Sequence, residues 1–169
     1  MAELDVRPGD CALEIGFGGG LTLERLLAVA RYVCGVDRSA DAVASASSQF
    51  VKEIERGAAE FMVGSVEELP LPAGSFDKVL TVNTVYFWTS LEAGMGEIRR
   101  VLTPGGRVVI GSVPKSVMDK MNMPPDIFTP REPEELVAAL SGAGFAVTKI
   151  EAPNGPAKAM LAVGETVAC

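Results

Sequence analysis

Short apolar runs alternate along the chain with longer stretches in which apolar residues recur every three or four positions. The short runs predict β-strands over residues 11–15, 32–36, 60–63, 76–82 and 107–112. The longer stretches predict helices over residues 22–31, 40–57, 91–102 and 134–142. Strands that alternate with helices in this way are typical of a parallel sheet with helices on both faces.

The C-terminal part of the chain departs from this alternation. Residues 114–133 contain five Pro and three Met, and they predict only one helical turn, at residues 117–121. Two further β-like runs, residues 145–152 and 157–164, flank an Asn-Gly pair, which is a strong signal for an antiparallel hairpin. The expected fold class is α/β, with a doubly wound, mostly parallel seven-stranded sheet that ends in this hairpin. We expect one domain over residues 1–169, with residues 1–10 as a short lead-in.

Charge and composition exclude several classes of partner. The 169 residues include 15 Lys and Arg against 22 Asp and Glu, a net charge of −7, and the basic residues are scattered. Such a protein repels phosphate backbones and anionic lipid, so we expect no nucleic-acid partner. The start of the chain does not have the pattern of a signal peptide, and no apolar run is long enough to span a membrane. The three Cys form no CxxC pair and are interpreted as reduced thiols of a cytoplasmic protein.

Histidine is absent from the sequence. This excludes a Ser-His-Asp or Cys-His nucleophile, a histidine general base and a histidine-ligated metal. We therefore expect no metal site.

A glycine-rich segment follows the first predicted strand and precedes a helix. Gly16 can adopt a turn geometry that is closed to other residues, and Gly18 and Gly20 leave no Cβ in the way of a ligand. On these glycines alone, a tight turn without a ligand explains the sequence equally well. Asp37 ends the second strand, 21 residues after Gly16, where an acidic side chain can bind ribose hydroxyls. The alternative role for Asp37 is the N-cap of the next helix, a role that Ser39 could fill instead.

Two kinds of nucleoside ligand compete for this loop. The dinucleotide fingerprint G-x-G-x-x-G fails because Leu21 stands at its third glycine position. Glu14, two residues before Gly16, would repel phosphate and attract a cation. The expected ligand is therefore a nucleoside with a positive group and no phosphate, which disfavours a nicotinamide-dependent dehydrogenase.

From about Val6 to Gly164, the sequence resembles the class I S-adenosylmethionine-dependent methyltransferases, in particular their small-molecule, type 11-like branch. Three blocks carry this resemblance: the E-x-G-x-G-x-G motif of residues 14–20, residues 63–72 with 75–79, and residues 100–108. The resemblance implies a Rossmann-like methyltransferase fold and S-adenosyl-L-methionine as cofactor, with S-adenosyl-L-homocysteine as product. It also implies methyl transfer to a small-molecule acceptor.

The resemblance implies roles for the residues around the methionine part of the cofactor. In the family, the glycine loop wraps this part, and the acidic residue before the loop places its ammonium group. These roles fall on Glu14, Gly16, Phe17, Gly18 and Gly20.

The nucleoside part has a second set of implied contacts. Asp37 would bind the ribose hydroxyls, and Arg38 would lie near the adenine. Ser65 stands where the family usually has an acid that contacts the adenine amino group. Its hydroxyl would accept that hydrogen bond more weakly, because the bond is not charge-assisted. Val66 is expected to supply a backbone N–H to the ring.

The segment after the fourth strand is expected at the reactive end of the cofactor. The resemblance implies that Asn83 and Thr84 are neighbours of the cofactor. Tyr86, Phe87 and Trp88 are candidate substrate contacts. The alternative is that these three aromatic residues only pack the start of a helix against the sheet.

Methyl transfer from a sulfonium needs alignment of the acceptor and exclusion of water. Without histidine, acceptors that need a strong base are disfavoured, and no catalytic residue is named. Three alternatives stay open for the site: residues 114–133 cover it, a partner subunit covers it, or it is not covered. We interpret the Met residues of 114–133 as core filler rather than as a lid. A cofactor-binding domain without turnover, acting as a sensor or partner subunit, is the alternative function. The sequence leaves the oligomeric state open, with a homodimer as one alternative.

Overall fold

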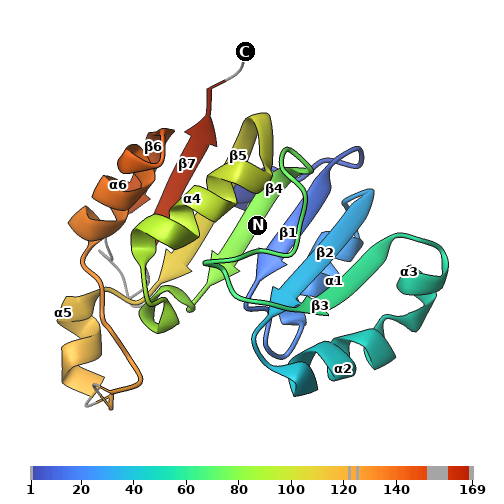
Figure 1. The fold of residues 1–169 in the computed structure, drawn as a ribbon, viewed down its shortest axis with the longest axis horizontal. Coiled ribbons are helices and arrows are strands. Elements are labelled where there is room, and N and C mark those ends of the chain that lie inside the picture. The colour runs from blue at the N-terminus through green and yellow to red at the C-terminus, as the bar shows by residue number, and fades with distance from the viewer. Residues whose placement is uncertain (1, 122, 125, 152–159, 168–169) are drawn as a thin grey trace.

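The computed structural model describes residues 2–121, 123–124, 126–151 and 160–167. Seven strands form one sheet in the order β3-β2-β1-β4-β5-β7-β6 (Figure 1). The strands are β1 (Cys11–Ile15), β2 (Tyr32–Asp37), β3 (Ala59–Val63), β4 (Phe76–Val82), β5 (Leu102–Ser112), β6 (Phe145–Glu151) and β7 (Met160–Thr166). Strands β1 to β5 are parallel, whereas β7 runs antiparallel to both β5 and β6. The predicted fold class is confirmed.

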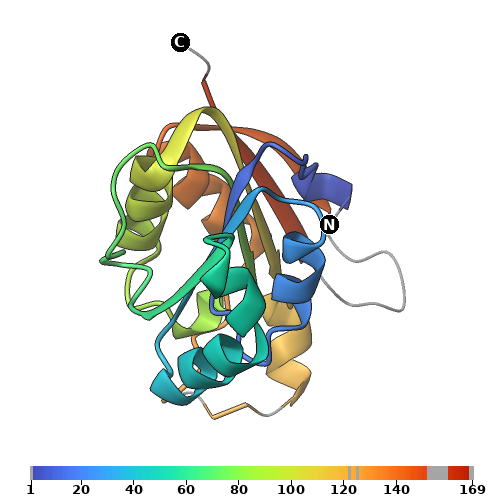
Figure 2. The same ribbon diagram turned by 90° about the vertical axis from the view of Figure 1, so that its right-hand side faces the viewer.

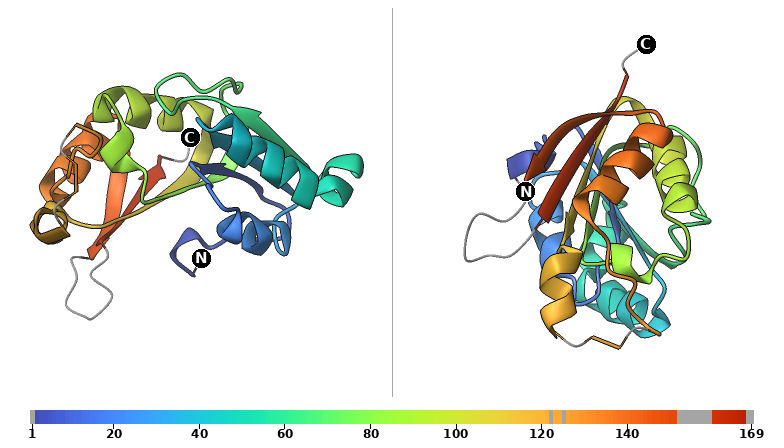
Figure 3. Two further views of the ribbon diagram at one scale, coloured as in Figure 1. Left: turned by 90° about the horizontal axis from the view of Figure 1, so that it is seen from below. Right: turned by 90° about the vertical axis from the view of Figure 1, so that its left-hand side faces the viewer.

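Helices cover both faces of the sheet. They are α1 (Leu21–Leu27), α2 (Ala40–Gln49), α3 (Val51–Glu55), α4 (Leu91–Val101), α5 (Lys115–Met118) and α6 (Pro133–Gly142), with 3-10 turns η1 (Ala2–Leu4), η2 (Val85–Phe87) and η3 (Asp119–Met121). Helix α1 lies on one face, and α4 and α6 lie on the other (Figures 2 and 3). Two apolar clusters fill these layers, one from the sheet to α4 and α6, the other from the sheet to α1, α2 and η1. The alternating apolar pattern of the sequence is therefore explained by burial on both faces of the sheet.

Two predicted helix boundaries were wrong. Helix α1 ends at Leu27 instead of residue 31, and the predicted helix 40–57 divides at Phe50 into α2 and α3. Phe50 has φ −107° and ψ 31°, outside the helical region, and only 7% of its surface is exposed. Its ring packs against Phe61 of β3 with the ring centroids 5.8 Å apart. The helix is broken at the residue whose ring is buried against β3. Local helix propensity alone would not predict a break at this position.

The later strands also differ from their predicted bounds. Strand β5 begins at Leu102, five residues before the predicted start, and the register shifts where it first meets β4, between Phe76 and Lys78. Strand β7 ends at Thr166, two residues after the predicted end at residue 164, and its predicted start at residue 157 lies outside the described residues. The Asn-Gly turn expected between β6 and β7 lies outside the described residues. Across the part of the chain that the structure describes, no helix combines the length and apolar character needed to cross a membrane.

Candidate cofactor site

The carboxyl ends of β1, β2 and β4 lie side by side and open into a cavity of about 410 Å³. This is the edge at which open α/β sheets bind ligands. The residues that line it come from the last positions of β1 and β2 and from the segments that follow β1, β2, β3 and β4. They are Ile15, Gly16, Gly18, Val36, Asp37, Arg38, Ser39, Gly64, Val66, Glu67, Asn83, Thr84, Phe87 and Trp88.

The glycine loop brings bare backbone to this cavity. Gly16 has φ +69°, and a Cβ at this position would collide with the methyl group of Thr84. Its N–H donates to Val36 O at 2.7 Å, which fixes the loop against β2. Gly18 has φ +49° but no atom near the position of a Cβ. Position 16 therefore requires glycine because of its backbone conformation and because there is no space for a Cβ. Position 18 requires glycine because of its backbone conformation alone.

Asp37 connects the glycine loop to the start of α2. One carboxylate oxygen accepts the N–H of Gly18 and the other accepts the N–H of Ser39, both at 2.9 Å. Ser39 is the N-cap of α2, and its hydroxyl oxygen accepts the N–H of Ala42 at 3.2 Å, as predicted. Each oxygen of Asp37 accepts one of these bonds and keeps a second lone pair, so both can still accept a hydroxyl group of a ligand.

Glu14 is a buried carboxylate beneath the glycine loop. It is 3% exposed, and its Oε2 atom has no hydrogen-bond partner among the described residues. Burial raises the pKa of Glu14 to about 7, against the effect of a hydrogen bond from Thr22 and with a smaller contribution from Asp37. A buried carboxylate with one unpaired oxygen is stabilised by a nearby cationic group and would repel a phosphate. A positively charged nucleoside therefore fits the residues present.

The loop after β3 holds a carboxylate that sequence reasoning did not place in the site. Glu67 lines the cavity, and its oxygens accept hydrogen bonds from the hydroxyl of Ser65 and from the N–H of Thr89, the latter at 2.7 Å. Burial works to raise the pKa of Glu67, but these hydrogen bonds outweigh it and hold the pKa below its ordinary value. Glu68 is exposed. The two acids are adjacent in the sequence, and only the fold shows that Glu67 is the one that lines the cavity.

The end of β4 carries a residue with positive φ. Asn83 has φ +57°, in the left-handed region, which Asn adopts more readily than most other non-glycine residues. The hydroxyl of Tyr86 donates to Asn83 Oδ1 at 2.8 Å and accepts the N–H of Val113 at 2.9 Å. Phe87 and Trp88 line the cavity, whereas Tyr86 does not and is 4% exposed. The side chain of Asn83 is thus oriented by a hydrogen bond from the buried Tyr86.

Residues 13–110 match the family model described as Methyltransferase domain. The chain belongs to this family. This is the family of the class I S-adenosylmethionine-dependent methyltransferases, whose cofactor is S-adenosylmethionine.

Individual relatives agree with this assignment. The uncharacterized methyltransferase YdaC of Bacillus subtilis (strain 168) is 34% identical over 115 residues, which cover 67% of this chain and 61% of that protein. The fatty-acid O-methyltransferase of Mycolicibacterium smegmatis is 34% identical over 109 residues, which cover 62% of this chain and 37% of that protein. This chain thus spans less than two thirds of the length of either relative. The crystal structure of a SAM-dependent methyltransferase from Aquifex aeolicus has the same fold, with a TM-score of 0.80, 20% identity and coverage of 98% of this chain and 87% of that chain.

The structure brings most of the predicted site residues of this methyltransferase together. Nine of them line the cavity: Gly16, Gly18, Asp37, Arg38, Val66, Asn83, Thr84, Phe87 and Trp88. Five others are not among its lining residues: Glu14, Phe17, Gly20, Ser65 and Tyr86. Of these five, Glu14 is buried under the loop, and Gly20 is the N-cap of α1. The Phe17 ring packs on Phe61, with centroids 5.8 Å apart.

Five lining residues were not predicted: Ile15, Val36, Ser39, Gly64 and Glu67. Ile15 and Val36 are recognisable only as neighbours of the predicted glycine and acid. Gly64 lies where a Cβ would come within 2.9 Å of Val36. That close approach is a property of the folded chain and has no local signal in the sequence.

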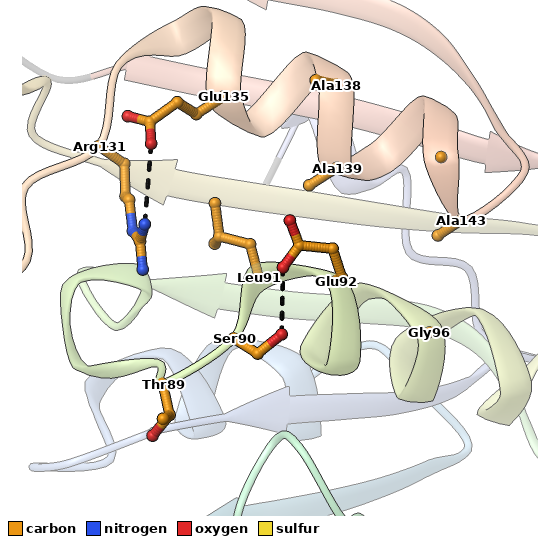
Figure 4. Close-up of a pocket in the computed structure, with 11 residues that line it drawn as sticks. Thr89, Ser90, Leu91, Glu92, Gly96, Arg131, Glu135, Ala138, Ala139 and Ala143 are labelled. Carbon is orange, nitrogen blue, oxygen red and sulfur yellow. Dashed lines mark hydrogen bonds and ion pairs between the residues drawn. The ribbon is translucent and has the colours of Figure 1, made fainter.

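A second hollow of about 670 Å³ lies between α4 and α6 (Figure 4). Arg131 extends from the start of α6 toward α4, donates to Trp88 O at 3.3 Å and pairs with Glu135 at 3.7 Å. Glu92, on the opposite wall, accepts the hydroxyl of Ser90 at 3.1 Å. None of the predicted site residues lines this hollow.

Proposed function

We propose that this protein transfers the methyl group of S-adenosylmethionine to a small-molecule acceptor. One observation carries the proposal. Gly16, Gly18 and Asp37 line a cavity at the carboxyl ends of β1, β2 and β4. The buried Glu14 lies beneath the glycine loop, and its Oε2 atom has no hydrogen-bond partner among the described residues. This arrangement fits a nucleoside that carries positive charge and no phosphate.

Bound S-adenosylmethionine supplies an electrophilic methyl group on a sulfonium. Gly16 and Gly18 let the backbone come close to the methionine part. The free lone pairs of Asp37 accept ribose hydroxyls, and the charge of Glu14 offsets the positive charge of the ligand. Phe87 and Trp88 exclude water from the reactive end, which strengthens these electrostatic contacts.

The class of acceptor and the setting are part of the proposal. One relative is named as a fatty-acid O-methyltransferase, which supports a small molecule as acceptor. We place the protein in the cytoplasm, since Cys11 and Cys34 are free thiols, and propose a single domain with a homodimer as one assembly to test. The described residues of 114–133 include Phe128, whose ring packs on Phe87 with centroids 4.8 Å apart, so this segment is proposed to cover the acceptor side.

Isothermal titration calorimetry with S-adenosylmethionine, S-adenosylhomocysteine and NAD tests the cofactor half of this proposal. We expect binding of both sulfur nucleosides and none of NAD. Binding of NAD alone would contradict the proposal. Mass spectrometry of a broad acceptor panel then tests turnover, and binding without any methylated product supports the non-catalytic alternative instead.

A further inference from the structure

Asn83 lies at the end of β4, where its N–H donates to Gly111 O of β5 at 2.7 Å. It lines the cofactor cavity, and its backbone is in the left-handed region at φ +57°. The side chain is exposed to the cavity rather than packed in the core. A polar side chain that faces a ligand cavity and is not needed for packing is a reason to look for function at that side chain.

The polarity of the Asn83 amide is fixed by Tyr86. The Tyr86 oxygen already accepts the N–H of Val113 at 2.9 Å, so its own proton is directed at Asn83 Oδ1, 2.8 Å away. Burial raises the pKa of Tyr86, which keeps the hydroxyl protonated at neutral pH. The Oδ1 atom is therefore occupied, and no described residue accepts a hydrogen bond from Nδ2. Asn83 thus offers hydrogen-bond donors to the cavity.

The carboxylates among the described lining residues are already engaged in hydrogen bonds with the protein. Asp37 and Glu67 line the cavity, and each of them accepts two hydrogen bonds from the protein. The sequence contains no histidine. Arg38 adds a positive charge at the rim, where it donates to Phe87 O at 3.4 Å. The cavity therefore favours a nucleophile that arrives without a proton to lose.

Beside Asn83, Phe87 presents an apolar ring to the cavity, and further apolar residues pack behind it. Phe87 is 40% exposed, and its ring packs against that of Phe128 with the centroids 4.8 Å apart. The ring of Tyr86 also packs on Phe128, with the centroids 6.3 Å apart. Ile127, next to Phe128, is 55% exposed. An acceptor that contacts Asn83 would have apolar surface available for the rest of its body.

We propose that the acceptor is an apolar molecule with an anionic nucleophile, a carboxylate in the first instance, and that Asn83, oriented by Tyr86, donates a hydrogen bond to this anion. This inference depends on the proposed function, because the anion attacks the methyl group of the cofactor. In that step, a carboxylate oxygen forms a bond to the methyl carbon, the carbon–sulfur bond breaks, and its electron pair stays on sulfur. No proton is transferred, so no base is required. Tyr86 is a positioning residue, since it acts through Asn83.

Three probes with the same alkyl chain test the inference without turnover. Octanoate, 1-octanol and octylamine are titrated by calorimetry into the protein saturated with S-adenosylhomocysteine. We expect octanoate to bind at least about tenfold more tightly than either of the others, because a hydrogen bond to a charged group is the stronger one. Equal or tighter binding of 1-octanol or octylamine would overturn the inference. If S-adenosylhomocysteine itself does not bind, the proposed function fails as well, so the two failures are distinguishable.

Variants separate the positioning role from a structural one. Tyr86→Phe is expected to reduce the preference for octanoate to less than about threefold while the affinity for S-adenosylhomocysteine changes by less than twofold. Tyr32→Phe is the matched control, since its hydroxyl hydrogen-bonds Glu60 at 3.0 Å, outside the cavity lining. The side-chain amide resonances of Asn83, followed by ¹⁵N NMR, should shift with octanoate in the parent protein and stay unchanged in Tyr86→Phe. Unchanged octanoate preference in Tyr86→Phe would contradict the positioning role.

A second substitution keeps the test decisive if Tyr86→Phe does not fold. Asn83→Asp replaces the donor with a carboxylate of the same shape. We expect it to lower octanoate affinity at least about tenfold and to raise that of octylamine, because the new charge repels an anion and attracts a cation. Unchanged affinity for both probes would overturn the inference.

Discussion

The two walls of the cofactor cavity are built in different ways. One, which we call the glycine wall, consists of Gly16, Gly18 and Asp37, and it presents backbone groups fixed by hydrogen bonds between neighbouring strands. The other, the aromatic wall, consists of Asn83, Phe87 and Trp88, and it presents side chains supported by residues far away in the sequence. The glycine wall depends on the absence of side-chain atoms, and the aromatic wall on their presence. The first should therefore tolerate far less change than the second.

Gly16→Ala is expected to have the largest effect. The added Cβ would collide with Thr84 in a backbone conformation at φ +69° that disfavours any side chain. We expect the free energy of unfolding to fall by about 3 kcal/mol and the affinity for S-adenosylhomocysteine at least about 100-fold. Urea unfolding and calorimetry measure these two quantities.

Gly18→Ala is the matched control, because Gly18 also has positive φ but has nothing within 4 Å of the Cβ position. It should lose only about 1 kcal/mol of unfolding free energy. Equal losses in the two variants would show that conformation alone, and not the contact with Thr84, makes the glycine wall intolerant.

Asp37→Asn comes next in expected size. An amide can keep one of the two backbone hydrogen bonds to Gly18 and Ser39, but it removes the charge that would hold the ribose hydroxyls. We expect a loss of about 2 kcal/mol in the binding of S-adenosylhomocysteine, or roughly 30-fold in the dissociation constant. Asp41→Asn, at an exposed position in the first turn of α2, should change it by less than about twofold. If both substitutions weaken binding alike, long-range charge and not the position of Asp37 is responsible.

The glycine wall was largely predictable from the sequence, and so was the sheet. The signals for both are local: an apolar strand, the glycines after it, and an acid at the end of the next strand. Once parallel order is inferred, the carboxyl ends of β1 and β2 must meet, and this places Gly16 beside Asp37. Ser39 could be recognised as the cap of α2 for the same reason, since capping depends on residues three apart.

The aromatic wall could be predicted from the sequence only in part. Sequence placed Tyr86, Phe87 and Trp88 together, but only the fold separates Tyr86 from the others, because its hydroxyl bonds Val113, 27 residues later. The break at Phe50 likewise coincides with a contact to Phe61 in another strand. These features depend on pairings between distant segments, which periodicity and spacing do not contain.

Glu14→Gln tests the electrostatic part of the glycine wall through pH. The pKa of Glu14 is raised from 4.5 to about 7 in the folded protein, so between these pH values the folded state binds more protons than the unfolded chain. The stabilising contribution is fully present below the unfolded pKa, and it is lost as pH rises toward 7. Between pH 5 and pH 8, the free energy of unfolding should therefore fall by about 2 kcal/mol more in the parent protein than in Glu14→Gln.

Urea unfolding at pH 5 and pH 8 gives this difference. Lowered pKa values at other carboxyls, such as Glu97, are common to both proteins and cancel in the comparison. The affinity for S-adenosylmethionine should rise between pH 6 and pH 8 in the parent protein, because a cation favours ionised Glu14, and should stay flat in Glu14→Gln. A parallel pH dependence in the two proteins would exclude Glu14 as the titrating group.

Glu67→Gln should have the smallest effect, because Glu67 lines the cavity without belonging to either wall. Its carboxylate joins the loop after β3 to the N–H of Thr89, just before α4, and an amide oxygen can still accept that bond at 2.7 Å. What the substitution removes is charge, so we expect only about a threefold loss of affinity for S-adenosylhomocysteine by calorimetry. Glu68→Gln, with the same change of charge at an exposed neighbouring position, should leave the affinity unchanged. A loss as large as that of Asp37→Asn would instead place Glu67 in direct contact with the cofactor, and the cavity would then have a third wall that binds through charge.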